Sequence, residues 1–315
     1  MDSECARNSS VSPQLSWQYP IARSGSTARS WREANPVLSA PSVSGGLRAV
    51  GSASVSRLLA FGDLHCDRRH LRSLVERAVH ERCDALVSLG DLCYLPSDPE
   101  GRRFLRSAGA LLRRAGLELL LVDGNHDDAE ALARAKARSV APGPVPLGFR
   151  LHHLPTGTRF RLGRLRCLAY GGAFPARPRR VGSEWHRSVV HERAVVQRLT
   201  AGGEIDVLFC HDPRTLEQGE QARGSFAALA AQLRPALVVY AHQHRPYVNA
   251  AGPRALLGLG SFKDDQTLAV VLDSAETGRL VRALRNQQTA AHLKLPNPRA
   301  STPRHGSGSD TCGVR

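Results

Sequence analysis

The sequence predicts an α/β fold in which two β-sheets pack face to face with helices on the outside. Three observations lead to this prediction. Short apolar runs alternate with segments of helical period between residues 56 and 137. Short β runs broken by Thr-Gly and Leu-Gly pairs follow at residues 149–172, as in a meander. Two more apolar runs, at residues 204–211 and 235–242, extend the β structure beyond a single sheet.

The first apolar run, SRLLAFGD, has the length and composition of a buried strand. In the segment RRHLRSLVERAVHER that follows, apolar residues from Leu71 to Val79 recur at helical spacing and define one apolar face. Asp67 stands where an N-cap residue belongs. The strand is therefore expected to lead into a helix that covers the sheet.

Two more strand–helix pairs follow in the chain. DALVSLGD and LELLLVDGN are buried runs, and GRRFLRSAGALLRRAG and DAEALARAKA have helical period. Gly116 is expected to end the first of these helices, and Asp127 to cap the second. The resulting βαβαβα order is typical of a sheet covered by helices.

The later part of the chain is expected to contribute mainly strands. EIDVLFCH and PALVVYAH are apolar runs with a helix between them, and RALLGLGSF, TLAVVLD and RLVRALR are expected to be further strands. Residues 174–200 form a polar, Arg-rich insertion that reads as partly helical from Glu184 onward. The ordered domain is thus expected to span residues 55–286.

The two ends of the chain differ in composition from this domain. Residues 1–54 are rich in Ser, Gly and Pro and have no sustained period, and residues 287–315 are similar. Such segments bury too little apolar surface to offset the entropy lost on ordering. Both are therefore expected to be disordered.

Composition limits the classes of function. The net charge is +15, and nearly all of the positive charge is Arg. This charge fits a nucleic-acid or anionic-substrate preference. It equally fits an Arg-rich, GC-type composition, which we favour because the Arg residues are scattered and aromatic residues are only 5%. No apolar run approaches the ~20 residues of a membrane-spanning helix.

The cysteines predict a reducing compartment. The chain has seven of them, an odd number, and no pair has C-x-x-C spacing. A disulfide framework is therefore not expected, and reduced thiols in the cytoplasm fit better. The first residues also lack the basic region and apolar core of a secretory signal.

Side chains of the kinds that bind metals follow five of the apolar runs. They are Asp63 and His65, Asp91, Asn125 and His126, His211, and His242 and His244. In an open α/β sheet the carboxyl ends of the strands converge on one crevice, so these side chains are expected to meet. Each alone could be an ordinary turn, cap or rim residue. Their joint occurrence in order, each after a buried run, favours a metal site.

The chemistry of this residue set is coherent. Carboxylate, imidazole and amide oxygen suit Mn, Fe, Zn or Mg ions, whereas a soft thiolate site would need Cys. Two ions bridged by one carboxylate could clamp the attacking and leaving oxygens of a phosphoryl transfer. A water near two such ions loses its proton easily, which provides hydroxide without a protein nucleophile.

The blocks GDLHCD, GDL, GNHD, FCHDP and AHQH resemble, in order, the five sequence blocks of the calcineurin-like metallophosphoesterases, over roughly residues 57–284. The resemblance implies a four-layer α-β-β-α sandwich with two mixed β-sheets and a site for two divalent metal ions. It implies that the first metal is held by Asp63, His65 and His244, that Asp91 bridges both, and that Asn125, His211 and His242 complete the second site. His126 would bind no metal; it would protonate the leaving oxygen or stabilise charge on the phosphoryl group.

Three positions depart from the family pattern. Cys66 stands where Gly is frequent, and Ala241 replaces the Gly that begins the last block, with little effect expected. Tyr94 stands where many relatives have an Asp that orients the catalytic His. The segment GDLCYLPS also lacks the Arg-Gly pair found in the Ser/Thr protein phosphatase branch. The segments GNHDD and HQHRP are more similar to small bacterial members of the phosphodiesterase type.

The sequence therefore predicts a cytoplasmic metal-dependent phosphoesterase. Hydroxide held by two divalent ions (Mn, Fe, Zn or Mg) would attack a phosphomonoester or phosphodiester, and His126 would assist the leaving group. The alternatives are a nuclease acting on DNA or RNA, favoured by the +15 charge, and a catalytically silent binding scaffold of the same fold. Cys66, Cys93 and Cys210 would lie near the metals, either as packing residues or as points of oxidative sensitivity.

Overall fold

The computed structural model describes residues 55–140, 142–173, 199, 201–213, 230–249, 254–261 and 269–294. The expectations for the N-terminal segment, for nearly all of the insertion at 174–200 and for the tail beyond 294 fall on residues outside these ranges. Within the described ranges, no helix has the length and apolar character needed to cross a bilayer.

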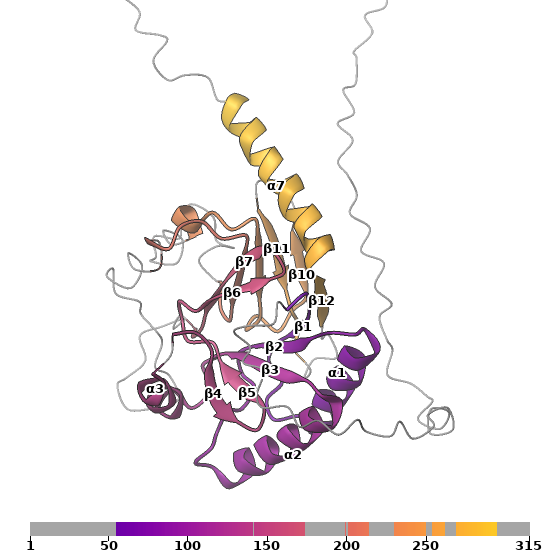
Figure 1. The fold of residues 1–315 in the computed structure, drawn as a ribbon, viewed down its shortest axis with the longest axis vertical. Coiled ribbons are helices and arrows are strands. Elements are labelled where there is room, and N and C mark those ends of the chain that lie inside the picture. Colours follow the sequence, from indigo (N-terminus) through magenta and orange to yellow (C-terminus); the bar gives the residue numbers. More distant parts are fainter. Residues whose placement is uncertain are drawn as a thin grey trace, which may run out of the picture. The chain divides into compact units, whose positions relative to one another are not determined.

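The first sheet has the strand order β12-β1-β2-β3-β5-β4 (Figure 1). Its strands are β1 (Arg57–Phe61), β2 (Ala85–Leu89), β3 (Glu118–Val122), β4 (Val145–Gly148), β5 (Leu151–His153) and β12 (Val270–Asp273). The four inner strands are parallel, and β4 and β12 pair antiparallel at the two edges. Every residue of β2 is buried, as expected for a strand covered on both faces.

Three helices follow the first three strands. They are α1 (Arg68–His80), α2 (Pro99–Ala115) and α3 (Ala129–Arg138). The Asp67 carboxylate accepts the N–H groups of Arg69 and His70, so Asp67 caps α1 as predicted. Gly116 ends α2 in a left-handed conformation, also as predicted. The prediction for Asp127 was wrong, because the carboxylate that caps α3 belongs to Asp128.

The second sheet has the strand order β10-β11-β9-β8-β7-β6. Its strands are β6 (Arg159–Leu162), β7 (Leu165–Tyr170), β8 (Val207–Cys210), β9 (Leu237–Tyr240), β10 (Tyr247–Asn249) and β11 (Ala255–Gly258). The inner strands are again parallel, with antiparallel strands at both edges. The predicted meander is divided between the sheets, since β5 pairs with β3 whereas β6 and β7 form a hairpin in the second sheet.

The last element corrects two predictions. The segment RLVRALR, expected as a strand, lies inside helix α7 (Ser274–Lys294), which also continues past the expected domain end at 286. Asp273 starts this helix by accepting the N–H groups of Ala275 and Glu276. Val281 and Leu284 are buried and lie three residues apart, which is a helical spacing. The prediction failed because a short apolar run fits a strand and a helix equally well.

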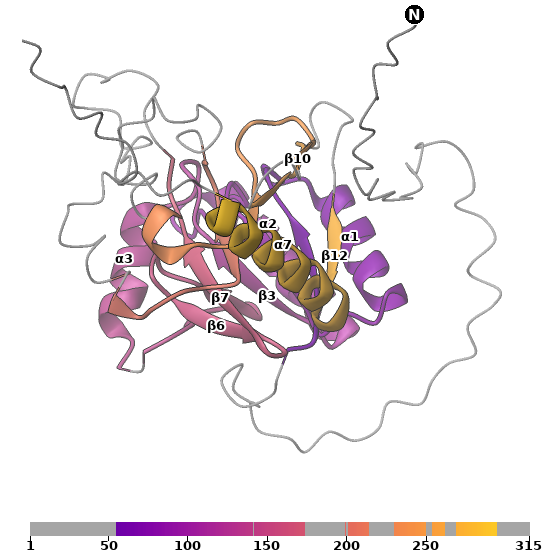
Figure 2. The ribbon, with the colours of Figure 1, turned by 90° about the horizontal axis from the view of Figure 1, so that it is seen from above.

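Three apolar clusters define the layers. One lies between the two sheets and includes Val281 and Leu284 of α7. A second lies between the first sheet and α1, α2 and α3, and a third on the outer face of the second sheet. Figures 1 and 2 show α2 and α7 on opposite sides of the paired sheets. The fold is thus an α-β-β-α sandwich with two mixed sheets, as predicted.

Candidate metal centre

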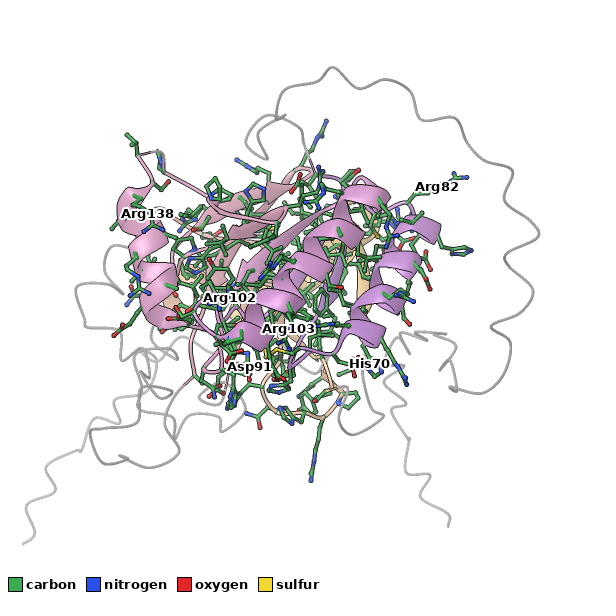
Figure 3. The ribbon with its side chains drawn as sticks, turned by 90° about the horizontal axis from the view of Figure 1, so that it is seen from below. His70, Arg82, Asp91, Arg102, Arg103 and Arg138 are labelled. Atoms are coloured by element: carbon green, nitrogen blue, oxygen red, sulfur yellow. A yellow bond between two sulfur atoms is a disulfide. The ribbon has the colours of Figure 1, made fainter. Side chains whose placement is uncertain are left out.

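The eight predicted site residues lie in the loops that follow the carboxyl ends of β1, β2, β3, β8 and β9. Parallel strands place these ends at the same edge of their sheet. In Figure 3, Asp91 marks this edge, and Arg82 and Arg138 lie at the opposite edge. The sandwich brings the loops of both sheets together there.

One group of candidate ligands combines the loop after β1 with the loop after β9. The ligand atoms of Asp63, His65 and His244 all lie within 4.8 Å of one another. His244 Nε2 is 3.3 Å from Asp63 Oδ1. The backbone N–H of His242 donates to the other Asp63 oxygen at 2.8 Å, which ties the two sheets together at this point.

A second group combines loops after β2, β3, β8 and β9. The ligand atoms of Asp91, His211 and His242 also lie within 4.8 Å of one another. Asn125 Oδ1 is 3.1 Å from His211 Nε2, so the amide joins this group. His211 Nδ1 donates to the Leu89 carbonyl at 2.7 Å, which fixes the ring and directs Nε2 into the group.

Asp91 lies between the two groups. Its Oδ2 is 3.9 Å from His65 Nε2, in the first group, and its Oδ1 is 3.5 Å from His211 Nε2, in the second. The side chain is almost fully buried. The two oxygens of one carboxylate thus face different groups of nitrogen and oxygen atoms.

His126 lies beside the Asp91 carboxylate but is much more exposed to solvent. Its backbone N–H donates to Asp91 Oδ1 at 2.8 Å, and its Nε2 lies 4.0 Å from Asp91 Oδ2. The His126 side chain is 48% exposed, whereas that of Asp91 is 2% exposed. The His126 ring is therefore more open to an incoming molecule than that of His244, whose side chain is 36% exposed.

The backbone of the site is unusual. Seven residues here are left-handed although none is glycine: Asp63, His65, Cys66, Asp91, Cys93, His242 and His244 have φ between 46° and 76°. Only a few per cent of non-glycine residues adopt this region, most often Asn, Asp and His, and such residues gather at functional sites. The loops therefore hold the candidate ligands in conformations that the surrounding structure must enforce.

Glycines allow the loops to approach one another. A Cβ on Gly90 would overlap the His211 ring, and a Cβ on Gly124 would overlap the Asp91 carboxylate. These contacts explain why the Asp and Asn of the second and third blocks each follow a glycine. A Cβ on Gly62 would likewise overlap that of Ala241.

The ionisable groups of the site influence one another strongly. Burial would raise the pKa of Asp63, but the hydrogen bond from His244 and the charge of His211 outweigh burial and lower it. Burial would lower the pKa of His211, but the charges of Asp91 and Asp63 outweigh it and raise it. The carboxylates and imidazoles of the site thus stabilise each other's charged forms.

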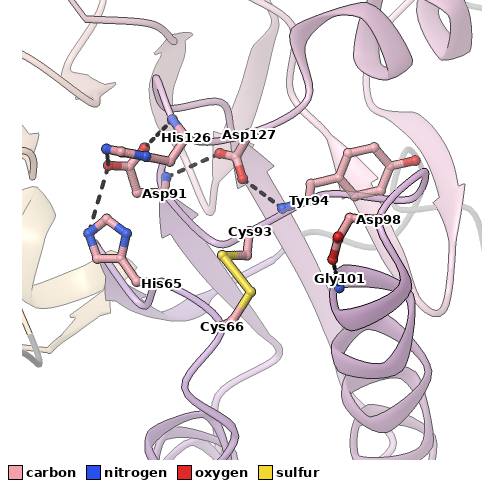
Figure 4. Close-up of a disulfide and its surroundings, with 9 residues drawn as sticks. All are labelled: His65, Cys66, Asp91, Cys93, Tyr94, Asp98, Gly101, His126 and Asp127. Carbon is pink, nitrogen blue, oxygen red and sulfur yellow. Dashed lines mark hydrogen bonds and ion pairs between the residues drawn. A yellow bond between two sulfur atoms is a disulfide. The ribbon is translucent and has the colours of Figure 1, made fainter. Parts of the chain in front are cut away.

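Sequence reasoning missed the role of Asp127. Its carboxylate accepts the backbone N–H groups of Asp91, Tyr94 and Gly124, at 3.1, 2.8 and 2.9 Å. Burial and the charge of Asp91 raise its pKa to about 6. Asp127 therefore joins the loop after β2 to the loop after β3 (Figure 4). Only its place inside GNHD could have suggested this function.

The expectation that the cysteines remain reduced was wrong for one pair. Cys66 and Cys93 form a disulfide, with Cα atoms 5.3 Å apart (Figure 4). The prediction failed because it considered only close spacing in sequence, whereas these residues are 27 positions apart and follow neighbouring parallel strands. Cys83 and Cys167 are buried thiols outside this bridge.

The residues present fit a pair of divalent ions. The two buried carboxylates among the candidate ligands, Asp63 and Asp91, are surrounded by imidazole nitrogens and an amide oxygen. This donor set suits Mn, Fe, Zn or Mg, and burial of two neighbouring carboxylates is costly without compensating cations. The sulfurs of Cys66 and Cys93 are bonded to each other and are not part of the donor set.

Comparison with known families assigns the class of protein. A profile of the calcineurin-like phosphoesterases matches residues 56–246, more than half of the chain. The chain therefore belongs to this family and is a hydrolase that acts on phosphoric ester bonds. A search of curated protein sequences gives no significant match.

Solved structures of low identity align with the chain. The protein TT1561 of Thermus thermophilus is 16% identical, with 70% of this chain and 99% of that chain covered and a TM-score of 0.45. A dimetal phosphatase from Danio rerio is 14% identical, with 66% and 88% covered and a TM-score of 0.44. YfcE, a phosphoesterase from E. coli, is 13% identical, with 69% and 88% covered and a TM-score of 0.35.

Proposed function

We propose that this protein is a metal-dependent phosphoesterase that hydrolyses a phosphomonoester or phosphodiester, with His126 assisting the leaving group. The observation that carries the proposal is the position of Asp91. One of its oxygens faces His65 and the other faces His211, at 3.9 and 3.5 Å. A carboxylate placed in this way can bind two ions at once, which a scaffold without catalysis does not need.

The remaining ligands follow from the two groups. Asp63, His65 and His244 would hold the first ion, and Asn125, His211 and His242 the second. When bound, the ions would supply Lewis acidity toward phosphoryl oxygens and lower the pKa of an attacking water. The imidazoles keep their orientation through contacts such as that of His211 Nδ1 with the Leu89 carbonyl.

His126 is proposed to donate a proton to the leaving oxygen. Two observations support this role: the His126 ring is exposed, and its backbone N–H donates a hydrogen bond to Asp91. Tyr94 stands where relatives often have a carboxylate partner, and its side chain is buried in the apolar cluster around α1, α2 and α3. In this chain, Asp91 is the carboxylate found near the His126 ring.

Further parts of the proposal concern the setting. A phosphodiester substrate, manganese as one of the accepted ions and a cytoplasmic location fit the Asp/His/Asn donor set and the block resemblance.

The test uses metal-stripped protein. Mn, Fe, Zn and Mg are restored singly, and hydrolysis of p-nitrophenyl phosphate and of bis(p-nitrophenyl) phosphate is measured. Activity is expected with at least one ion, and His126→Ala should reduce it while His70→Ala, a change at the same edge of the molecule, should not. Absence of hydrolysis with every ion would refute the proposal, and activity toward only one ester would assign the substrate class.

The nuclease alternative is kept as an outcome of a further experiment. It rests on the net charge of +15, yet Arg82 and Arg138 lie at the edge opposite Asp91 (Figure 3). Cleavage of single-stranded and duplex DNA or RNA, with affinity that falls steeply as salt increases, would support a nuclease. Hydrolysis of small esters without nucleic-acid cleavage would exclude it.

A further inference from the structure

The Cys66–Cys93 disulfide lies within the proposed metal centre. Cys66 directly follows the candidate ligand His65, and Cys93 is two residues beyond Asp91. The bridge thus connects the loop that carries one group of ligands to the loop that carries the shared carboxylate (Figure 4). None of the proposed catalytic steps uses these sulfur atoms.

The fold brings the two cysteines together without help from the bridge. Strands β1 and β2 are parallel neighbours, with Phe61 opposite Ser88. Beyond the strands, Asp63 N–H donates to the Gly90 carbonyl at 3.2 Å and His65 N–H to the Asp91 carbonyl at 2.9 Å. The loops therefore stay paired up to the cysteines, so two reduced thiols in this fold would remain close enough to form the bond again.

The conformation and exposure of the pair also distinguish it. Cys66 and Cys93 have φ of 65° and 76°, a region where Gly or Asn is the usual choice. Both are partly exposed, whereas Cys83 and Cys167 are buried, and burial raises the pKa of Cys167 well above its usual range. A small thiol or disulfide reagent can therefore reach the sulfurs of Cys66 and Cys93 but not those of the buried cysteines.

We propose that Cys66 and Cys93 are a reversible thiol–disulfide site that sets the metal affinity of the centre, an inference that rests on the proposed function. The bridged form has both ligand groups assembled. Reduction removes the covalent link between the loops of His65 and Asp91 and leaves their two backbone hydrogen bonds. The bridged form therefore binds metal more tightly than the reduced form.

The reaction partner is a low-molecular-weight disulfide. One cysteine thiolate attacks its S–S bond, forms a mixed disulfide and releases one thiol. The second cysteine thiolate attacks the mixed disulfide, forms the Cys66–Cys93 bond and releases the second thiol. The two cysteines lose two electrons and two protons, and the reagent gains them as two thiols. A small thiol reverses both steps.

The expected effect is graded. The backbone hydrogen bonds survive reduction, so the change resembles the loss of a residue that supports a metal ligand rather than the loss of a ligand. Loss of such a support typically costs 10–100-fold in metal affinity. We expect reduction to weaken Mn²⁺ binding about tenfold, near the lower end of that range.

The experiment compares the full chain in two states, one treated with glutathione disulfide and one with a phosphine reductant, each freed of reagent before use. Thiols are counted after denaturation, and Mn²⁺ binding is measured by calorimetry. The count should fall from seven to five on oxidation, and peptide mapping should show Cys66 joined to Cys93. The dissociation constant for Mn²⁺ should be about tenfold lower in the oxidised state.

The variants separate the bridge from other effects. Cys66→Ser and Cys93→Ser, made singly and together, should bind Mn²⁺ like the reduced protein under both treatments. Cys83→Ala, which changes a buried thiol outside the bridge, should keep the full redox response. A variant that fails to fold is replaced by the other single variant, since either change alone removes the bridge.

The outcomes distinguish failure of the redox proposal from failure of the proposed phosphoesterase reaction. Equal affinity of the two states, or failure of the bridge to form, overturns the redox proposal while hydrolysis can still support the phosphoesterase. Redox-dependent Mn²⁺ binding without hydrolysis of any ester supports the redox site and overturns the proposed reaction. Absence of metal binding in both states overturns both proposals.

Discussion

The two sheets contribute different halves to the centre. The first sheet provides Asp63, His65, Asp91 and Asn125, and the second provides His211, His242 and His244. The first half holds both carboxylates and is joined internally by a disulfide and by the Asp127 carboxylate. The second half contributes imidazoles as its candidate ligands, and the buried carboxylate of Asp212 lies 3.6 Å from one of them, His242.

Two of the hydrogen bonds between the halves involve backbone groups. His242 N–H donates to Asp63, and His211 Nδ1 donates to the Leu89 carbonyl, at 2.8 and 2.7 Å. The difference suggests a division of labour, in which the first half is a preassembled carboxylate platform and the second half completes it. A change at Asp91, which faces both groups, should therefore affect both ions, and a change at a ligand of the second half should affect one.

Replacement of Asp91 by Ala gives the largest expected effect. Asp91 faces both groups, so the variant should lose binding of both ions and all hydrolysis, by more than the 100-fold that an outer-shell change costs. His211→Gln, in the second half, should retain one ion. Metal content after saturation, measured by mass spectrometry, checks the contrast. Two ions retained by Asp91→Ala would contradict the bridging role.

Replacement of His126 by Ala tests a residue of the first half that is not a ligand. Loss of a general acid should lower kcat by about 10²–10⁴-fold while both ions remain bound. Steady-state kinetics and metal content on the same sample check this expectation. A simultaneous loss of metal would show that His126 is a ligand, and His70→Ala serves as the matched control.

Replacement of Asp127 tests the rigidity of the platform. Asp127→Ala leaves three buried N–H groups without their acceptor, at about 1–3 kcal/mol for each group that stays unsatisfied. Asp127→Asn keeps one side-chain oxygen and should be less destabilising. Urea unfolding of the metal-free protein measures the free energy of unfolding of both variants. Equal stability of the alanine variant and the parent would show that the hydrogen bonds of Asp127 do not stabilise these two loops.

The smallest effect is expected far from both halves. Burial would raise the pKa of Asp206, but hydrogen bonds from Arg166, and the charges of Arg166 and Arg285, outweigh it and lower the pKa. The lowered pKa means that this carboxylate stabilises the fold above the unfolded-state value near 3.8, and that the stabilisation is lost as pH falls through the folded-state pKa.

Asp206→Asn should therefore cost about 0.5–1 kcal/mol at pH 7, because solvent screens this partly exposed network. The difference from the parent should shrink as pH falls below about 4. Thermal unfolding across this pH range measures it, and a difference that persists at low pH would assign the effect to packing. Hydrolysis at pH 7 should not change.

Much of the site could be predicted because each candidate ligand lies directly after a strand that can be recognised from a short stretch of sequence. Each candidate ligand follows a buried run, and the rule that parallel strands end at one edge is enough to bring Asp63 near Asp91. The α-β-β-α sandwich followed from the resemblance, and the order of strands and helices in the first sheet followed from periodicity. The roles assigned to the individual ligands stay predictions until metal is measured.

Sequence reasoning missed three features: the Cys66–Cys93 bond, the role of Asp127 and helix α7. The Cys66–Cys93 bond depends on the register between two neighbouring strands, which spacing in sequence does not reveal. Asp127 looked like a helix cap because the next residue, Asp128, fills that role with the same chemistry. Helix α7 was missed because its apolar segment is short enough to read either way.

The close approach of Gly62 and Ala241 has a consequence for reading related sequences. Only one methyl group fits between these two strand ends, and in this chain it belongs to Ala241. Residues 62 and 241 therefore behave as one position shared by two sheets. An alanine at 62 would be compatible with a glycine at 241. Replacement of the usual glycine of the last block by Ala241 is therefore compatible with the fold as long as residue 62 remains glycine.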